Sequence, residues 1–450
     1  MLQSISQGSY GKVYKTEHKG KNYAIKSPKA TKNFGITELR EIDIAVRFRH
    51  PYVAQLLNVK ENKQKYTFVF PLADGTIITL SKELEEELEY VKYIVQLLLG
   101  LDYVHKRGII LMDIKPANIL YFRDDDSLRF NDFGVSLYND PVFTNESGGT
   151  PIYMSPEVLI ENNAVPKSDV WSLGLTLLEV ITGVNPQDKV FDKLEEQKIS
   201  YSKIPYKDEY ITLYKKLLDE YIMETLKKIN NTNLMTTLHG MLTINVKERF
   251  SIDEILSMPW LKRFKRYAKL IEKTFVGCPI ITNYVNSYNL KQNFPIMQNF
   301  LKNVSKKDEG VKWAIINAVD IVNYLITTNN TEDDITTAAI ALLLSLKIYS
   351  HSYEDLSYFI SLLPQSTKLN KKELLKYEEK ILKILNYKVY RKNIFSFLLE
   401  LKVKIDDFNK LFIYVTETEF SGELPEYAYI FLEENKLHVR KVLFNAVHNV

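Results

Sequence analysis

The sequence LMDIKPAN at residues 111–118, followed by DFG beginning at Asp132, decides the fold of this chain. Phosphoryl transfer depends mostly on positioning and on neutralising charge, so it needs a base, a lysine near the phosphates and ligands for a metal ion. Asp113 can act as the base, and Lys115 can steady the transferred phosphate. Asn118 and Asp132 can bind the metal ion. The order and spacing of these side chains predict a phosphoryl-transfer site.

Two stretches near the N-terminus fit the same chemistry. ISQGSYGKV at residues 5–13 follows the glycine-rich phosphate-binding pattern G-x-G-x-x-G-x-V, with Ser6 in place of the first glycine. YAIK at residues 23–26 comes next on an expected strand. A lysine in an apolar strand needs a carboxylate partner, and Glu41 on the following expected helix is the candidate partner of Lys26.

Three stretches downstream complete the ordered set: SPE at residues 155–157, DVWSLG at residues 169–174 and KERF at residues 247–250. Arg249 is expected to pair with Glu157 in a structural role. Each motif alone could occur in an unrelated protein, but the occurrence of all of them in this order could not be explained in that way. The stretch from residue 1 to about 264 resembles a eukaryotic-type protein kinase, and the lysine in DIKP indicates the serine/threonine class.

This resemblance implies a two-lobed α+β protein kinase fold in residues 1–266, with a small lobe of about 1–73 and a large lobe of about 74–266. It also implies an enzyme, a phosphotransferase that uses ATP and Mg²⁺ and modifies serine or threonine in a protein substrate. Asp113 and Lys115 would be the catalytic residues, and Asn118 and Asp132 the metal ligands. Phe70 would be the gatekeeper before the hinge. The ATP-binding residues implied by the resemblance are Gly8, Gly11, Val13, Ala24, Lys26, Glu41, Phe70, Leu72 and Ala73.

The expected helix after the lysine strand indicates a kinase subfamily. GITELREI at residues 35–42 is similar to the P-S-T-A-I-R-E helix of cyclin-dependent kinases, and RHP at residues 49–51 matches their N-H-P. Ser9 and Tyr10 stand where that family carries an inhibitory Thr-Tyr pair, so they are candidate phosphosites. These residues are equally compatible with an ordinary kinase, in which Tyr10 has a packing role.

The C-terminal part of the chain reads as helical from about residue 294. The expected helices are 311–326, 334–349, 354–363 and 371–386. The second is apolar nearly all round, which indicates burial on every side. Lys347 and Glu378 interrupt otherwise apolar helical faces, where a lone charge is costly. They are expected to pair with each other or to contact another surface.

This part resembles the cyclin box, in which a helix ends in A-S-K-x-x-E and a later helix reads M-E-x-x-I-L. The resemblance implies an all-α cyclin-like domain at 294–400, after a connector at 267–293 and before a helical extension at 401–450. In cyclins the corresponding lysine and glutamate grip the P-S-T-A-I-R-E region. The resemblance therefore implies kinase–cyclin contacts at Leu39, Lys347 and Glu378, and a cell-cycle type of kinase activated by its own cyclin-like domain.

Composition excludes several classes of protein. Lys and Arg number 59 against 56 Asp and Glu, a balance that argues against binding of nucleic acid or a membrane surface. No stretch approaches the roughly 18 apolar residues of a membrane span. The single cysteine, Cys278, cannot form an internal disulfide. We therefore expect an intracellular protein of the cytoplasm or nucleus, and the fusion would suit a large DNA virus acting in its host cell.

Two alternatives remain open from the sequence. The C-terminal part could be an unrelated helical docking module, or the kinase fold could be a pseudokinase scaffold, because Leu111 and Met112 replace His-Arg before Asp113. Activation-loop phosphate in cyclin-dependent kinases is read by three arginines. Arg40 matches the first, but Met112 and Leu137 occupy the other two positions. This predicts an activation loop that is ordered without phosphorylation.

Overall fold

The computed structural model describes two compact units. The first comprises Met1–Lys32, Arg47–Asn139 and Phe143–Cys278, and the second comprises Asn33–Val46, Asp140–Val142 and Pro279–Val450. The residues described are 3–8, 11–18, 20–28, 36–62, 65–139, 143, 148–262, 264–265, 284–285, 314, 317–318, 321–322, 325, 334–349, 370–390 and 422–423. Ser9 and Tyr10, the candidate phosphosites, lie outside them, as does the expected helix at 354–363.

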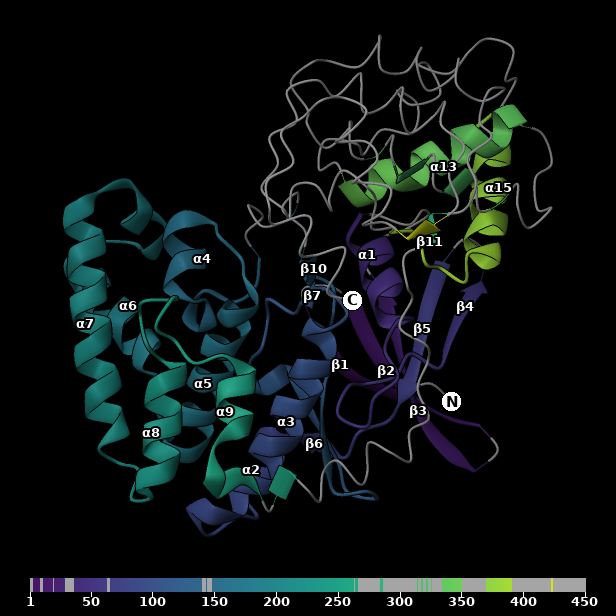
Figure 1. Cartoon of the computed structure of the whole chain (residues 1–450). Coiled ribbons are helices and arrows are strands. Elements are labelled where there is room, and N and C mark those ends of the chain that lie inside the picture. Colours follow the sequence, from purple (N-terminus) through teal and green to yellow (C-terminus); the bar gives the residue numbers. More distant parts are fainter. Residues whose placement is uncertain are drawn as a thin grey trace. The chain divides into compact units, whose positions relative to one another are not determined.

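A five-stranded antiparallel sheet opens the first unit (Figure 1). Its strands, in spatial order, are β1 (Gln3–Gly8), β2 (Gly11–His18), β3 (Lys21–Pro28), β5 (Lys65–Pro71) and β4 (Asn58–Asn62). Val13 lies opposite Lys26, which lies opposite Phe68, and Ala24 lies opposite Phe70. Opposed residues share a face, and so do residues two apart on one strand. Val13, Ala24, Lys26 and Phe70 therefore lie on one face of the sheet.

Short strands hold the loops that carry the predicted catalytic residues. They are β6 (Gly75–Thr76), β7 (Ile109–Ile110), β8 (Ile119–Phe122), β9 (Ser127–Phe130) and β10 (Leu137–Tyr138). Residues 111–118 run from β7 to β8, and residues 131–136 run from β9 to β10. Because β8 pairs with β9 and β7 pairs with β10, both loops are tied together at their two ends.

Helices form the remainder of the first unit. They are α2 (Ile77–Ser81), η1 (Glu87–Glu89), α3 (Tyr90–His105), η2 (Pro116–Asn118), η3 (Pro151–Tyr153), α4 (Pro156–Glu161), α5 (Pro166–Thr182), α6 (Pro186–Glu196), η4 (Tyr201–Tyr206), α7 (Asp208–Leu226), α8 (Thr232–Met241), α9 (Ile252–Ser257) and η5 (Pro259–Leu261). Proline at the first turn suits the starts of α4, α5 and α6. The core is centred on α3 and α5, which bury most of their side chains. At Gly174 in α5 a Cβ would lie 3.0 Å from the Met241 Cβ, so a larger residue would require α8 to shift by a few tenths of an ångström. The sheet followed by these helices agrees with the predicted two-lobed α+β fold.

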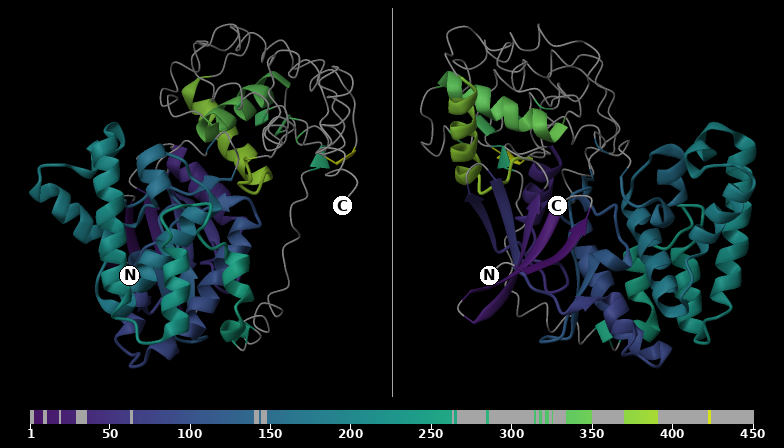
Figure 2. Two further views of the ribbon diagram at one scale, coloured as in Figure 1. Left: turned by 60° about the vertical axis from the view of Figure 1, so that its left-hand side comes forward. Right: turned by 180° about the vertical axis from the view of Figure 1, so that it is seen from behind.

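The second unit contains α1 (Ile36–Ala45), α13 (Asp334–Tyr349) and α15 (Lys371–Ile384). α1 packs against α13, and α13 packs against α15 (Figure 2). The helix predicted at 334–349 is confirmed, and its side chains from Thr336 to Tyr349 are all buried. A capping box between Asn370 and Glu373 begins α15.

Three other predictions for this part are covered incompletely. The described positions of the helix at 311–326 are helical and buried: Ala314, Asn317, Ala318, Ile321, Val322 and Leu325. In the connector and the helical extension, the structure describes only β11 (Tyr284–Val285) and β12 (Gly422–Glu423), which pair with each other. The extension is thus strand rather than helix at these two positions, because a distant segment supplies the pairing. No helix among the described residues is long and apolar enough to cross a membrane.

Candidate active site

Asp113 is the centre of a hydrogen-bonded group in the loop between β7 and β8. Lys115 Nζ donates to its Oδ2 at 2.7 Å, and Asn118 Nδ2 donates to the same oxygen at 3.0 Å. The Thr150 hydroxyl donates to Oδ1 at 2.7 Å, and Lys115 Nζ also contacts that hydroxyl at 2.7 Å. Both carboxylate oxygens are therefore oriented by neighbours. The sequence brought together Asp113, Lys115 and Asn118 but missed Thr150, although the adjacent SPE motif marked this stretch.

A second aspartate holds the backbone of this loop. Asp169, at the start of α5, is fully buried and accepts hydrogen bonds from the backbone N–H groups of Leu111 at 2.8 Å and Met112 at 2.9 Å. His105 Nε2 lies 2.8 Å from the same carboxylate. Met112 has a φ of 68°, a left-handed conformation that a non-glycine residue adopts only at a cost. The contacts of Asp169 offset that cost and fix the direction in which Asp113 leaves the backbone.

Gly149 brings Thr150 to the catalytic loop. Its φ is +103°, and a Cβ at this position would lie 2.3 Å from the carbonyl oxygen of Met112. Only glycine permits this backbone approach. The stretch before SPE is therefore packed directly onto the loop that carries Asp113.

Lys26 and Asp132 form an ion pair with an Nζ–Oδ1 distance of 2.7 Å. Asp132 has a φ of 64°, and the N–H of Asn131 donates to the carbonyl of Asn118 at 2.9 Å. Phe133 is fully buried and packs edge-on against Phe48, with 5.0 Å between ring centroids. The DFG segment is thus joined both to the sheet and to the catalytic loop. Glu41 is a buried carboxylate of the other unit, so its predicted pairing with Lys26 stays a prediction.

Apart from Glu41, the predicted nucleotide-binding residues lie on one sheet face or next to it. Val13 and Ala24 share the face of Lys26, and Phe70, the predicted gatekeeper, is buried at the end of β5. Gly8 and Gly11 lie opposite each other where β1 meets β2. Leu72 and Ala73, which directly follow β5, are half-buried. Their binding of ATP stays a prediction.

The side chains of Asn118 and Asp132 fit a magnesium ion. Asn118 uses its Nδ2 to donate to Asp113, which leaves its amide oxygen as the ligand atom. Asp132 supplies a carboxylate that is 23% exposed. Mg²⁺ is usually held by one or two protein oxygens together with substrate phosphates. Among the residues described, no group of three or more His, Cys, Asp or Glu is suited to hold a metal by itself.

The predicted pair of Glu157 and Arg249 is confirmed. Arg249 donates to both oxygens of Glu157, at 2.7 and 2.9 Å, and its guanidinium is completely buried. The Ser168 hydroxyl donates to the same carboxylate at 2.8 Å. Burial raises the pKa of Glu157, but the hydrogen bonds and charge of Arg249 outweigh this and leave the pKa below its ordinary value. This pair fastens α4 to the segment before α9, which is the structural role expected from the sequence.

The kinase–cyclin contacts predicted at Leu39, Lys347 and Glu378 stay a prediction. Leu39 is buried in α1, as a contact residue should be. Lys347 and Glu378 are both buried and form an ion pair with each other, which links α13 to α15. Two residues of α1 that the sequence did not single out for this role make polar contacts with the C-terminal part, namely Arg40 with the Ile348 carbonyl and Asp43 with the Tyr390 N–H. The ion pair between Lys347 and Glu378 is one of the two alternatives that the sequence left open for these charges.

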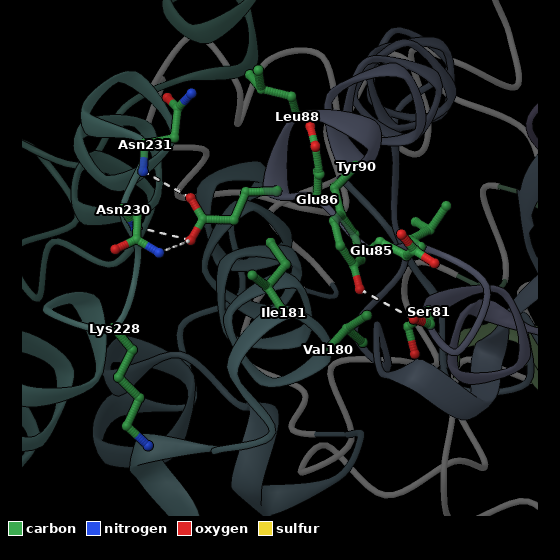
Figure 3. A pocket seen from close by; sticks show the side chains of 12 residues that line it. Ser81, Glu85, Glu86, Leu88, Tyr90, Val180, Ile181, Lys228, Asn230 and Asn231 are labelled. Atoms are coloured by element: carbon green, nitrogen blue, oxygen red, sulfur yellow. Dashed lines mark hydrogen bonds between the residues drawn. The ribbon is translucent and has the colours of Figure 1, made fainter.

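A cavity of about 780 Å³ in the first unit contains none of the predicted site residues (Figure 3). At its edge, the Glu87 carboxylate accepts hydrogen bonds from the backbone N–H groups of Asn230 at 2.9 Å and Asn231 at 2.7 Å. The Asn231 side chain in turn caps α8. Glu87 therefore joins η1 to the start of α8, and this role is structural.

Comparisons with known proteins agree with this site. The family model for the protein kinase domain matches residues 1–261. Serine/threonine-protein kinase pakH of Dictyostelium discoideum is 30% identical over 277 residues, which are 58% of this chain and 49% of that protein. CBL-interacting protein kinase 12 of Oryza sativa subsp. japonica is 31% identical over 275 residues, 58% of this chain and 46% of that protein.

A shorter match is to hormonally up-regulated neu tumor-associated kinase homolog A of Xenopus laevis, which is 34% identical over 200 residues, 41% of this chain and 28% of that protein. The chain thus spans less than half the length of these three relatives. The kinase match nevertheless covers more than half of this chain, and it contains every residue of the site built around Asp113. The chain therefore belongs to the protein kinase domain family, and its kinase domain is of the serine/threonine class.

Proposed function

We propose that the chain is a Mg-ATP-dependent serine/threonine protein kinase of the cyclin-dependent type, activated in cis by its cyclin-like C-terminal region. The observation that carries the kinase activity is the Asp113 carboxylate, oriented by Lys115, Thr150 and Asn118. A carboxylate held in this way is prepared to accept the proton of a substrate hydroxyl.

Each charged residue of the site has a distinct task in phosphoryl transfer. Asp113 orients the serine or threonine hydroxyl of the substrate and takes up its proton. Lys115 neutralises charge on the transferred phosphate, and Lys26 holds the remaining phosphates. Bound Mg²⁺, held by Asn118 and Asp132, would supply further charge neutralisation. Fixed charges of this kind act without reorganisation when the reaction occurs.

Removing the proposed base tests the catalytic part. Asp113→Asn in the full chain should lower turnover of a peptide substrate by about 10²- to 10⁴-fold, because general base catalysis and positioning are lost together. ATP binding, measured by fluorescence with a nucleotide analogue, should persist. Asp219→Asn on the exposed surface of α7 is the matched control and should leave turnover unchanged. Turnover close to wild type in Asp113→Asn would show that Asp113 is not the base, whereas no turnover above background in the wild-type chain would favour the pseudokinase scaffold.

The cis-activation part rests on α1. Its sequence is similar to the P-S-T-A-I-R-E helix, and it packs against α13 in the C-terminal region. A partner that holds this helix can align Glu41 for pairing with Lys26, which is how kinases are commonly switched on. The three relatives named above are not cyclin-dependent kinases by name. The subfamily therefore depends on the α1 sequence and on the cyclin-like helices.

Dividing the chain separates an activator from a docking module. Residues 1–266 should phosphorylate a generic peptide slowly, and residues 290–450 added separately should raise that rate. A docking module would leave the rate on a generic peptide unchanged and would alter only the choice of protein substrate. Equal rates for the isolated kinase half and the full chain would disprove activation in cis.

A further inference from the structure

Asp43 is a buried charge that neither the kinase motifs nor the proposed catalytic mechanism explains. It lies in α1, is 0% exposed and stands between Ile42 and Ile44, which are also fully buried. Its Oδ1 accepts hydrogen bonds from two consecutive backbone N–H groups, those of Val389 and Tyr390, the latter at 3.0 Å. A carboxylate loses its hydrogen bonds to water when it is buried, and this is costly unless other hydrogen-bond donors replace them. Here those donors come from the segment that follows α15.

That segment is shaped to present these two donors. α15 ends at Ile384, and Asn386 and Tyr387 then adopt left-handed conformations with φ of 48° and 61°. The N–H of Tyr387 donates back to the Leu382 carbonyl at 2.8 Å. This reversal turns the chain into residues 388–390. On its other side, the Val389 carbonyl accepts from Asn317 Nδ2 at 3.1 Å, so the segment is held from both sides.

Arg40 makes the complementary contact one turn earlier on α1. Its Nε donates to the Ile348 carbonyl at 2.9 Å, near the C-terminal end of α13. Residues three apart share one face of a helix, so Arg40 and Asp43 lie on the same face of α1. A helix C-terminus carries partial negative charge and exposed N–H groups carry positive charge. The positively charged Arg40 therefore meets a backbone carbonyl, and the negatively charged Asp43 meets backbone N–H groups.

We propose that Asp43 is a latch residue, by which α1 recognises residues 385–390 of its own chain as its binding partner. The partners are backbone atoms, so recognition depends on the left-handed turn at Asn386 and Tyr387 rather than on particular side chains. The binding role is independent of catalysis. Its consequence for kinase activity rests on the proposed function, because only cis activation links the position of α1 to turnover.

Hydrogen exchange in the full chain tests the latch directly. Asp43→Ala should speed exchange of the Val389 and Tyr390 amides by roughly 10- to 100-fold, because two buried donors lose their acceptor. Asp43→Asn is nearly isosteric and keeps one acceptor oxygen, so its increase should be smaller. Amides of α5 provide the internal reference, and Asp219→Ala provides the matched control. Unchanged protection at residues 389 and 390 in both Asp43 variants would overturn the proposal.

Two further measurements separate the possible results. If amide exchange at residues 389 and 390 rises in the Asp43 variants while turnover stays at the wild-type level, the latch is supported and activation in cis is contradicted. If the wild-type protection of residues 389 and 390 disappears on dilution as a dimer dissociates, the segment comes from a second copy, and the intramolecular latch is wrong. Should Asp43→Ala fail to fold, Asp43→Asn alone decides the matter, since it preserves the volume of the side chain.

Discussion

Asp169 in the kinase domain and Asp43 in α1 make the same kind of contact in two different regions. Each is fully buried, and each accepts hydrogen bonds from two consecutive backbone N–H groups of a loop. Asp169 holds Leu111 and Met112, which are 58 and 57 residues away. Asp43 holds Val389 and Tyr390, which are 346 and 347 residues away.

The difference lies in what each aspartate fastens. Asp169 fixes a loop inside one domain, next to the base Asp113, and His105 supports its carboxylate from the side. Asp43 fastens a helix with a kinase-type sequence to the segment that follows α15. The contact of Asp169 positions the loop that carries Asp113. The contact of Asp43 can regulate the position of α1, because a segment attached to the same chain acts at an effective concentration of about millimolar order.

Within this comparison, the largest expected effect comes from Asp169, the positioning aspartate in the kinase domain. Asp169→Asn should lower kcat by on the order of 10²-fold, because the loop with Asp113 shifts relative to the bound substrate. The KM for ATP should change little, since the sheet face with Lys26 is untouched. Steady-state kinetics on the full chain measures both. A larger loss of kcat in Asp43→Asn than in Asp169→Asn would break the comparison.

The second prediction contrasts the two buried ion pairs. Lys347→Ala leaves Glu378 buried without its partner, and Arg249→Ala does the same to Glu157, so each should destabilise its own unit by about 3–5 kcal/mol. Hydrogen exchange should show the loss in α13 and α15 for the first variant, and in α4 and α5 for the second. Lys347→Ala should also lower kinase activity while the kinase lobes stay folded.

A matched double variant sharpens this result. Lys347→Met combined with Glu378→Leu replaces the ion pair by apolar side chains of similar size, which is often neutral for stability. Protection of α13 should therefore largely return. Continued loss in the double variant would show that the charges themselves, and not the filled space, hold the two helices together. Loss of protection in α5 for Lys347→Ala would contradict the separation of the two units.

The smallest expected effect is that of activation-loop phosphorylation. A loop phosphate needs charge-assisted partners. Met112 and Leu137 are buried and apolar, and the Arg40 guanidinium donates to the Ile348 carbonyl. Phe143 is fully buried with its ring 5.3 Å from Tyr138, which anchors the loop by packing. Bacterially produced, phosphatase-treated protein should be as active as phosphorylated protein, within about twofold.

Mass spectrometry paired with the kinase assay is the check for this prediction. In cyclin-dependent kinases the activation-loop acceptor is a threonine whose position corresponds to Asn145 here, and the phosphorylatable side chains close to it are Thr144 and Ser147; all three lie outside the described residues. A large gain in activity on phosphorylation of either one would refute the prediction. The Thr144→Val variant serves as the control for the first of them.

The sequence by itself determined the kinase domain and most of its site. Asp113, Lys115, Asn118 and Asp132 stand in short motifs whose spacing follows from the loops that carry them, so local order was sufficient. Periodicity also predicted the bounds of α13, because a helix apolar on all sides has no other stable place than a core. Lys347 and Glu378 were recognised as misplaced charges, although two kinds of partner were open for them.

Only the tertiary structure decided which groups meet across long separations. Thr150 reaches Asp113 because Gly149 can approach the Met112 carbonyl, and no spacing rule contains that contact. Lys347 pairs with Glu378, and Asp43 accepts hydrogen bonds from the N–H groups of Val389 and Tyr390. The physical reason is that nearly every residue carries the same backbone N–H and C=O groups, so the sequence does not show which of them will be hydrogen-bond partners of a side chain. Their availability depends on turns such as that at Asn386 and Tyr387, which exist only once the chain has folded.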